Sequence, residues 1–135
     1  MTAKEYLLQA HHLDQRIKCK IEQVASLNDL ARKATATISD MPGNPNKGVS
    51  AMANAVEKIV DLQAEINRDI DRLVDMKMEI EKAVRQLGNI DEQLLLRCRY
   101  INNMNWDDIA AELSVSYRTV HRIHASALKN FIVPK

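Results

Sequence analysis

Hydrophobic residues recur every three or four positions along most of this 135-residue chain, which is the pattern of amphipathic helices. The first such segment has its apolar or small positions at Tyr6, Ala10, Leu13, Ile17, Ile21, Val24, Leu27, Ala31 and Ala34. Thr2 and Glu5 precede it with the spacing of a T-x-x-E capping box. We expect a helix of about 35 residues that fades at 35–37, where β-branched residues weaken it.

The sequence MPGNPNKG at 41–48 interrupts this pattern, because two prolines and two glycines in so short a run do not continue a helix. We predict a loop over 41–49 and a second long helix from about Ser50. Its nearly heptad-spaced apolar positions are Met52, Val56, Ile59, Leu62, Ile66, Ile70, Leu73, Met76, Ile80, Val84 and Leu87. So narrow a stripe cannot be buried by one helix alone. Its partner is the first helix folded back as an antiparallel hairpin, a second chain, or both.

Shorter helices are expected after Gly88, which we interpret as the residue that ends the second long helix. Asn89 is the expected cap of the next helix, with Glu92 at capping-box spacing. The apolar face of that helix is predicted at Leu94, Leu95, Cys98 and Ile101.

The segment 107–131, DDIAAELSVSYRTVHRIHASALKNF, has the layout of a helix-turn-helix. Its inward positions are Ile109, Ala110 and Leu113 before the turn and Val120, Ile123, Ala127, Leu128 and Phe131 after it. Asn105 and Ser116 are the expected N-caps of the two helices. Ser114 stands at a turn position that tends towards the left-handed conformation, which is costly for any residue other than glycine.

The predicted fold class is therefore all-α: a long antiparallel helical hairpin over 1–88, then a three-helix helix-turn-helix domain over 89–135. Composition agrees, because aromatic residues make up only 4% of the chain, which does not suit a β-sandwich or an α/β enzyme.

Charge changes sign at the turn. The net charge of +1 excludes a basic coat over the whole protein, so any binding of phosphates must come from a local patch. The segment 114–135 contains no acidic residue, whereas 107–112 contains no basic one. We predict a recognition helix over 117–132 that enters the major groove of double-stranded DNA. The expected DNA-binding residues are Ser116, Tyr117, Arg118, Thr119, His121, Arg122 and Lys129.

The segment from Leu94 to Phe131 resembles region 4 of sigma-70-class factors and, more closely, the phage-encoded ArpU/RinA-like late-gene activators. The matching positions are Arg99-Tyr100-Ile101, Trp106, Ile109-Ala110, Leu113, Ser116, Val120, His124-Ala125 and Ala127-Leu128. The resemblance implies transcriptional regulation by promoter binding and allows for a contact with RNA polymerase. It covers about 40 residues and does not extend to the aromatic promoter-melting region, so a self-sufficient sigma factor is not expected.

Two other readings stay open. Small terminase subunits of phage packaging machines also join a helix-turn-helix to helical assembly regions, and a coiled-coil adaptor could dock on RNA polymerase. In each reading, residues 3–87 are expected to hold a homodimer or a higher homo-oligomer together.

Catalysis, cofactors and metals are not expected. The chain contains no P-loop, GxGxxG or Ser/His/Asp arrangement. His121 and His124 are three residues apart, but that helix adds no carboxylate or thiol to complete a metal site; we expect His124 to pack beside Trp106. The two cysteines, Cys19 and Cys98, are interpreted as reduced thiols. No apolar run is long enough to span a membrane, and we expect a cytoplasmic protein.

Overall fold

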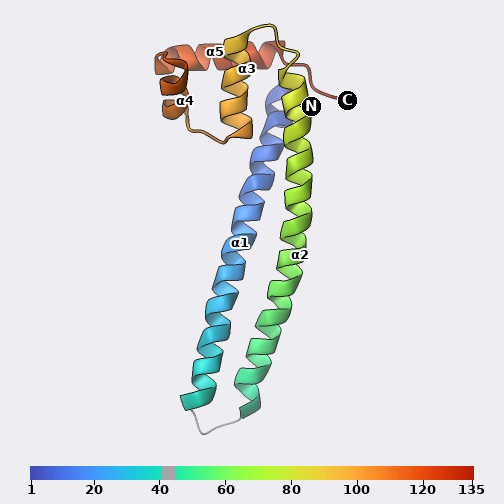
Figure 1. Cartoon of the computed structure of the whole chain (residues 1–135), viewed down its shortest axis with the longest axis vertical. Coiled ribbons are helices and arrows are strands. Elements are labelled where there is room, and N and C mark those ends of the chain that lie inside the picture. The colour runs from blue at the N-terminus through green and yellow to red at the C-terminus, as the bar shows by residue number, and fades with distance from the viewer. Residues whose placement is uncertain (41–44) are drawn as a thin grey trace. The chain divides into compact units, whose positions relative to one another are not determined.

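The computed structural model describes the backbone of residues 1–40 and 45–135, and the side chains of 1–34 and 50–135. In these ranges it contains helices and no strand, which confirms the all-α class. The elements are α1 (Ala3–Asp40), α2 (Pro45–Val84), α3 (Ile90–Leu96), the π-helical η1 (Arg97–Ile101), α4 (Trp106–Leu113) and α5 (Tyr117–Asn130) (Figure 1).

The ends of the long helices differ partly from those expected. The Thr2–Glu5 capping box is confirmed, since Glu5 N donates to Thr2 Oγ1 at 3.1 Å and Thr2 N donates to Glu5 Oε2 at 3.3 Å. The weakening expected at 35–37 does not end α1, which continues to Asp40. The predicted loop over 41–49 is wrong from Pro45 onwards, because α2 begins there. Proline suits a first helical position, where its missing N–H is not needed. Residues 41–44 lie outside the described residues.

Gly88 does not have the role expected of it. α2 ends at Val84, and a short turn follows in which Gln86 N donates to Ala83 O and Leu87 N donates to Val84 O. No glycine has a positive φ among the described residues, so Gly88 is not a left-handed helix-ending residue.

The described residues form two compact units, one of 1–14 with 72–135 and one of 15–71. Both units contain segments of α1 and α2. This division does not test the domain boundary expected at residue 88, so that boundary stays a prediction. In the second unit the Lys20 ammonium contacts Asp69 at 2.7 Å and Glu65 at 3.4 Å. In the first unit the Tyr6 hydroxyl donates to Glu79 at 3.3 Å. In each unit α1 and α2 therefore lie side by side and antiparallel, as predicted for a hairpin within one chain (Figure 1).

The buried face of α2 is narrower than the predicted stripe. Ile59, Ile66, Leu73 and Ile80, seven residues apart, are buried, as a heptad repeat requires. Val56 and Ile70 were expected beside them but are 50% and 40% exposed. Val56 is three residues before Ile59, and Ile70 is three residues before Leu73, so each lies next to the buried row on the helix surface. None of the described helices is long and apolar enough to cross a lipid bilayer.

The core of the C-terminal helices includes Leu95, Leu96, Ile109, Val120 and Ala127, all fully buried. The expected inward position of Leu94 is wrong, because this side chain is 41% exposed and Leu96 is buried in its place. α3 packs mainly on α5, so the face that carries Leu95 and Leu96 turns inward.

Candidate nucleic-acid interface

The turn between α4 and α5 is fixed by local capping. Asn105 Oδ1 accepts from Asp108 N at 2.8 Å at the start of α4, and Ser116 Oγ accepts from Thr119 N at 3.2 Å at the start of α5. Both predicted N-caps are therefore confirmed. Between them Ser114 has φ 57° and ψ 42°, the left-handed conformation that the sequence indicated. The geometry of this turn fixes the direction in which α5 leaves α4, and most of the candidate DNA-binding residues lie in the first turns of α5.

A buried carboxylate holds α5 to α3. Glu92 is 5% exposed, and its Oε1 accepts from Ser126 Oγ at 2.6 Å and from Asn130 Nδ2 at 3.2 Å. The expected capping box is only half present: Asn89 Oδ1 accepts from Glu92 N at 3.2 Å, but the Glu92 side chain reaches α5 instead of turning back. A buried charge needs such donors, so Glu92 fixes the position of the last turns of α5.

A row of aromatic rings secures the side of α5 that faces α4. The Trp106 ring lies 4.7 Å from the rings of both His121 and His124, measured between centroids. Tyr117 lies edge-on to His121 at 4.5 Å, and the Arg99 guanidinium lies 4.5 Å from the Trp106 ring centre. The expected packing of His124 beside Trp106 is confirmed.

This row changes the role available to His121. The residue was expected to point outward towards DNA, but its ring lies between Trp106 and Tyr117, and its Nε2 is buried without a hydrogen-bond partner. His121 therefore supports the surface from below, and we leave it out of the proposed contacts.

His124 is half-buried and electrically neutral at ordinary pH. Its Nε2 lies 2.7 Å from the Tyr100 hydroxyl, which is itself buried. Burial is the main cause that lowers the pKa of His124 from 6.5 to about 4, and electrostatic interactions with Lys4, His121 and Arg99 contribute to the same shift. The described residues contain no group of three or more His, Cys, Asp or Glu side chains arranged for a metal ion.

The remaining candidate residues lie on the outer side of α5 and the turn. Arg118, Arg122 and Lys129 are exposed, as are Ser116 and Tyr117, while Thr119 is half-buried. Arg118 and Arg122 are four residues apart, so they lie one turn apart on one side of the helix. The structure thus places two exposed arginines on one side of the N-terminal half of α5, with Lys129 more than one turn further on. α5 ends at Asn130 and not at 132, with Phe131 buried after it.

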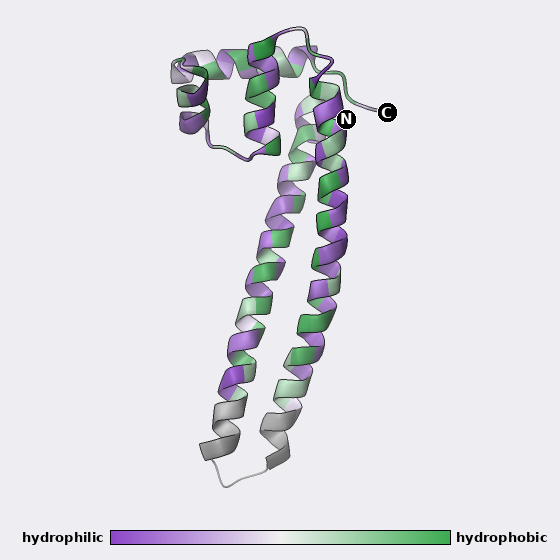
Figure 2. Cartoon of the chain, in the orientation of Figure 1, coloured by the Kyte–Doolittle hydropathy of each residue, from purple (hydrophilic) through white to green (hydrophobic). Residues whose placement is uncertain are grey.

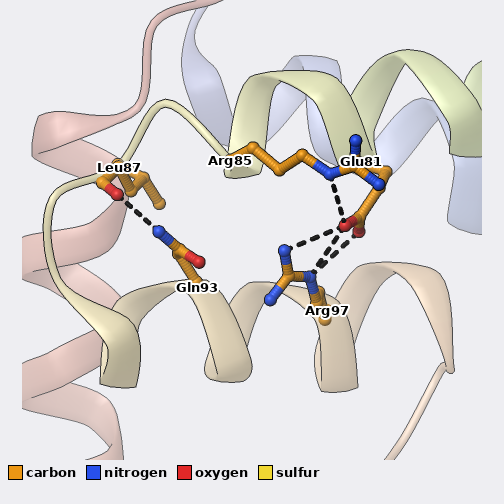
Figure 3. Close-up of polar contacts among 5 residues, drawn as sticks. All are labelled: Glu81, Arg85, Leu87, Gln93 and Arg97. Atoms are coloured by element: carbon orange, nitrogen blue, oxygen red, sulfur yellow. Dashed lines mark hydrogen bonds and ion pairs between the residues drawn. The ribbon is translucent and has the colours of Figure 1, made fainter.

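A charged cluster joins the C-terminal helices to the end of α2 (Figure 3). Arg97 Nη2 lies 2.9 Å from Glu81 Oε1, and Arg97 Nε donates to Glu81 Oε2 at 3.0 Å. Arg85 contacts the same carboxylate at 3.3 Å. The hydrogen bond from Arg97 lowers the pKa of Glu81. Beside this cluster, Gln93 Nε2 donates to the carbonyl oxygen of Leu87.

Sequence reasoning missed the Glu92 and Arg97 contacts. One signal was present for the first: Glu92 stands three residues before Leu95 and four before Leu96, so it shares their buried face. For Arg97 the sequence contains no such signal, because its partner is on another helix.

The comparisons with known proteins give one match. No curated protein and no solved structure matches the chain. A family model described as "Protein of unknown function (DUF1492)" matches residues 49–131. The match includes nearly all of α2 together with α3, η1, α4 and α5. Because it covers more than half of the chain, the protein belongs to the DUF1492 family.

Proposed function

We propose that this protein is a sequence-specific DNA-binding transcriptional regulator whose helix α5 enters the major groove. The observation that carries the proposal is the pair Arg118 and Arg122, exposed one turn apart near the N-terminus of α5. Arginine in this position is the usual reader of guanine in the major groove, and it also neutralises phosphate.

Three features support this assignment over an ordinary solvated helix. The inner side of α5 is committed to the core by Val120 and Ala127, and to α3 by Glu92. Its outer side carries cations with no acidic residue from 114 to 135. The left-handed Ser114 and the Ser116 cap make a tight corner between α4 and α5, and a corner of this kind is what a DNA-binding helix-turn-helix requires. The resemblance to sigma region 4 points the same way and makes a contact with RNA polymerase part of the proposal.

Self-association is the second part of the proposal. A single module of this size covers only about 600–1,000 Å² of surface on DNA, which gives weak binding. Two copies would place two α5 helices on neighbouring half-sites and raise the affinity. We assign the contact between copies to the long helices.

The experiment is selection of bound duplexes from a random-sequence DNA library by the full-length protein, followed by sequencing. The proposal predicts enrichment of one motif, made of two related half-sites separated by about one helical turn. Enrichment without a common motif would mean phosphate binding only. Retention that does not respond to salt would contradict a DNA interface, because displaced counterions make such binding salt-dependent.

A further inference from the structure

The last turns of α2 and η1 border an apolar hollow within the first unit. Val74 and Met78 of α2 and Ile101 of η1 line an open cavity of about 410 Å³. Val74 is 51% exposed and Met78 is 58% exposed, and the two lie one helical turn apart. All three residues belong to the segment 72–135, so the hollow lies in one unit and does not involve the other.

The exposed side chains of the hollow lie outside the core row of α2. Leu73 and Ile80 form the core side of this part of the helix, at 8% and 1% exposed. Val74 and Met78 are not in that row, and Figure 2 shows hydrophobic positions recurring among hydrophilic ones along α2. Large apolar side chains that gather at an exposed hollow are typical of a binding surface.

The edge of the hollow is cationic. It carries Lys77, Lys82 and Arg85 together with the carboxylate of Glu81. Arg97 Nη2 lies 2.9 Å from Glu81 Oε1, and Arg85 Nε lies 3.3 Å from the same oxygen, so the charge of Glu81 is compensated. In the part of the chain that the structure describes, Lys77 and Lys82 form no ion pair. The charge left at the edge is therefore positive, and two ammonium groups are available to a partner.

An apolar floor with a cationic edge selects among partners. A phosphodiester backbone would be attracted by the cations, but it carries no apolar group that could fill the floor. Helical spacing places Lys77 and Lys82 on opposite sides of the row that Val74 and Met78 form. An amphipathic helix with an apolar ridge and carboxylates on both flanks matches this arrangement. From Lys77 to Arg85 the cations extend over roughly 12 Å of α2, which is about two turns of a docked helix.

We propose that this hollow is the docking site for a short acidic amphipathic helix of another protein. A large apolar side chain of that helix fills the space between Val74, Met78 and Ile101, and carboxylates on its two flanks pair with Lys77 and Lys82. The proposal goes beyond DNA binding and does not depend on it, since none of these residues belongs to α5.

The first test is selection of binders to the immobilised full-length protein from a phage-displayed library of random peptides, each about 15 residues long so that a helix can form. We expect enrichment of peptides in which large apolar residues recur every three or four positions and are flanked by Asp or Glu. A library without enrichment, or enrichment of basic or uncharged peptides, would overturn the proposal.

The second test locates the bound peptide. An enriched peptide carrying a fluorescent label is titrated with each variant of the protein, and binding is followed by fluorescence anisotropy. Met78→Asn should weaken binding about tenfold. The matched control is Arg72→Asn, which places the same side chain on an exposed position of α2 outside the hollow and should bind like the parent. Equal affinities of the two variants would overturn the proposal.

The third test reverses charge at the edge of the hollow. Lys77→Glu and Lys82→Glu should each weaken binding about threefold to tenfold at low salt, and less at high salt, because salt screens the pairs. A peptide in which lysines replace the acids should bind Lys77→Glu more tightly than it binds the parent. Lys135→Glu makes the same charge change at the end of the chain and should leave binding unchanged. An unchanged affinity in both Lys77→Glu and Lys82→Glu would overturn the pairing.

Two further measurements separate this site from other roles. Sedimentation equilibrium compares the oligomeric state of the parent with that of Met78→Asn; an oligomeric parent that becomes monomeric in this variant would make the hollow a contact between copies and overturn the proposal. DNA selection with Met78→Asn should return the parent's motif, and Arg118→Ala should bind the peptide like the parent. Peptide binding that persists when DNA selection fails would therefore contradict the DNA proposal alone.

Discussion

Arg97 of η1 holds Glu81 of α2 through both carboxylate oxygens, with contacts of 2.9 and 3.0 Å (Figure 3). The two residues are 16 positions apart and belong to different helices, so no local sequence pattern predicts that they make contact. Their side chains are 30% and 28% exposed, so water screens the pair only in part. This contact helps to fix the C-terminal helices against the end of α2 within the first unit.

Removal of this ion pair should destabilise the first unit. For Arg97→Met we expect a loss of about 1–2 kcal/mol in the free energy of unfolding, because the Glu81 carboxylate loses its main donor. Urea denaturation at neutral pH measures the loss. The control is Arg85→Met, which removes the 67% exposed partner of the same carboxylate and should cost about 0.5 kcal/mol or less. Equal effects of the two changes would contradict the account.

The buried carboxylate of Glu92 gives a sharper test of how α5 is positioned. Glu92→Gln keeps the size of the side chain but replaces one oxygen by a donor that faces the donors Ser126 and Asn130. We expect a loss of about 1–3 kcal/mol. Asp91→Asn changes the exposed neighbour in the same way and should have little effect. An unchanged free energy of unfolding for Glu92→Gln in urea denaturation would show that the hydrogen bonds of Glu92 with Ser126 and Asn130 do not stabilise the fold.

Ser114→Gly should stabilise the protein by about 0.5–1 kcal/mol, because glycine adopts the left-handed φ of 57° without the strain that a side chain brings. The more flexible unfolded chain offsets part of the gain. Thermal unfolding followed by circular dichroism measures the change. The control Ser116→Gly should lower stability, since it removes the cap of α5. A destabilising Ser114→Gly would mean that the hydroxyl has a role that the structure does not reveal.

Acid should weaken the fold through His124. Its pKa is about 4 in the folded protein and 6.5 in the unfolded chain, so the unfolded chain takes up the proton first as pH falls. Stability is therefore complete above about pH 6.5 and is lost as pH falls from there towards 4. After allowance for the part of the ring that water reaches, we expect a loss of about 1–2 kcal/mol between about pH 7 and about pH 5.

The measurement is urea denaturation at several pH values, followed by the fluorescence of Trp106, the single tryptophan. His124→Gln should flatten the slope between pH 7 and 5, whatever its effect on absolute stability. His12→Gln changes an exposed histidine and should leave the slope unchanged. The same slope in His124→Gln would assign the acid sensitivity to other groups.

The parts of this molecule that could be predicted from sequence are those set by neighbouring residues. The caps at Asn105 and Ser116 and the left-handed Ser114 depend on hydrogen bonds over three or four positions, so a short window of sequence contains both partners. The helices themselves follow from periodicity. Pro45 shows the limit, because the same residue breaks a helix in its interior and starts one at its first turn.

The features that could not be predicted depend on partners distant in sequence. The way α4 crosses α5 decides whether His121 points outward or lies under Trp106. Helical periodicity alone places His121 near the boundary between the buried and the exposed side of α5. Leu94 and Leu96 are equally apolar, so only the packing of α3 on α5 selects the buried one. On α2, Val56 and Ile70 match the apolar repeat but are exposed. Local spacing alone does not tell which apolar residues of such a repeat are buried and which are exposed.

The central claim is that the outer side of α5 reads DNA. The most direct measurement is the affinity of the full-length protein for its selected duplex and for a scrambled duplex, by fluorescence anisotropy in matched salt. Arg118→Ala and Arg122→Ala should each lose about 1–3 kcal/mol on the selected duplex and less on the scrambled one, while Arg16→Ala, an exposed arginine of α1, should bind like the parent. If both variants keep the affinity and the sequence preference of the parent, α5 is not the recognition helix.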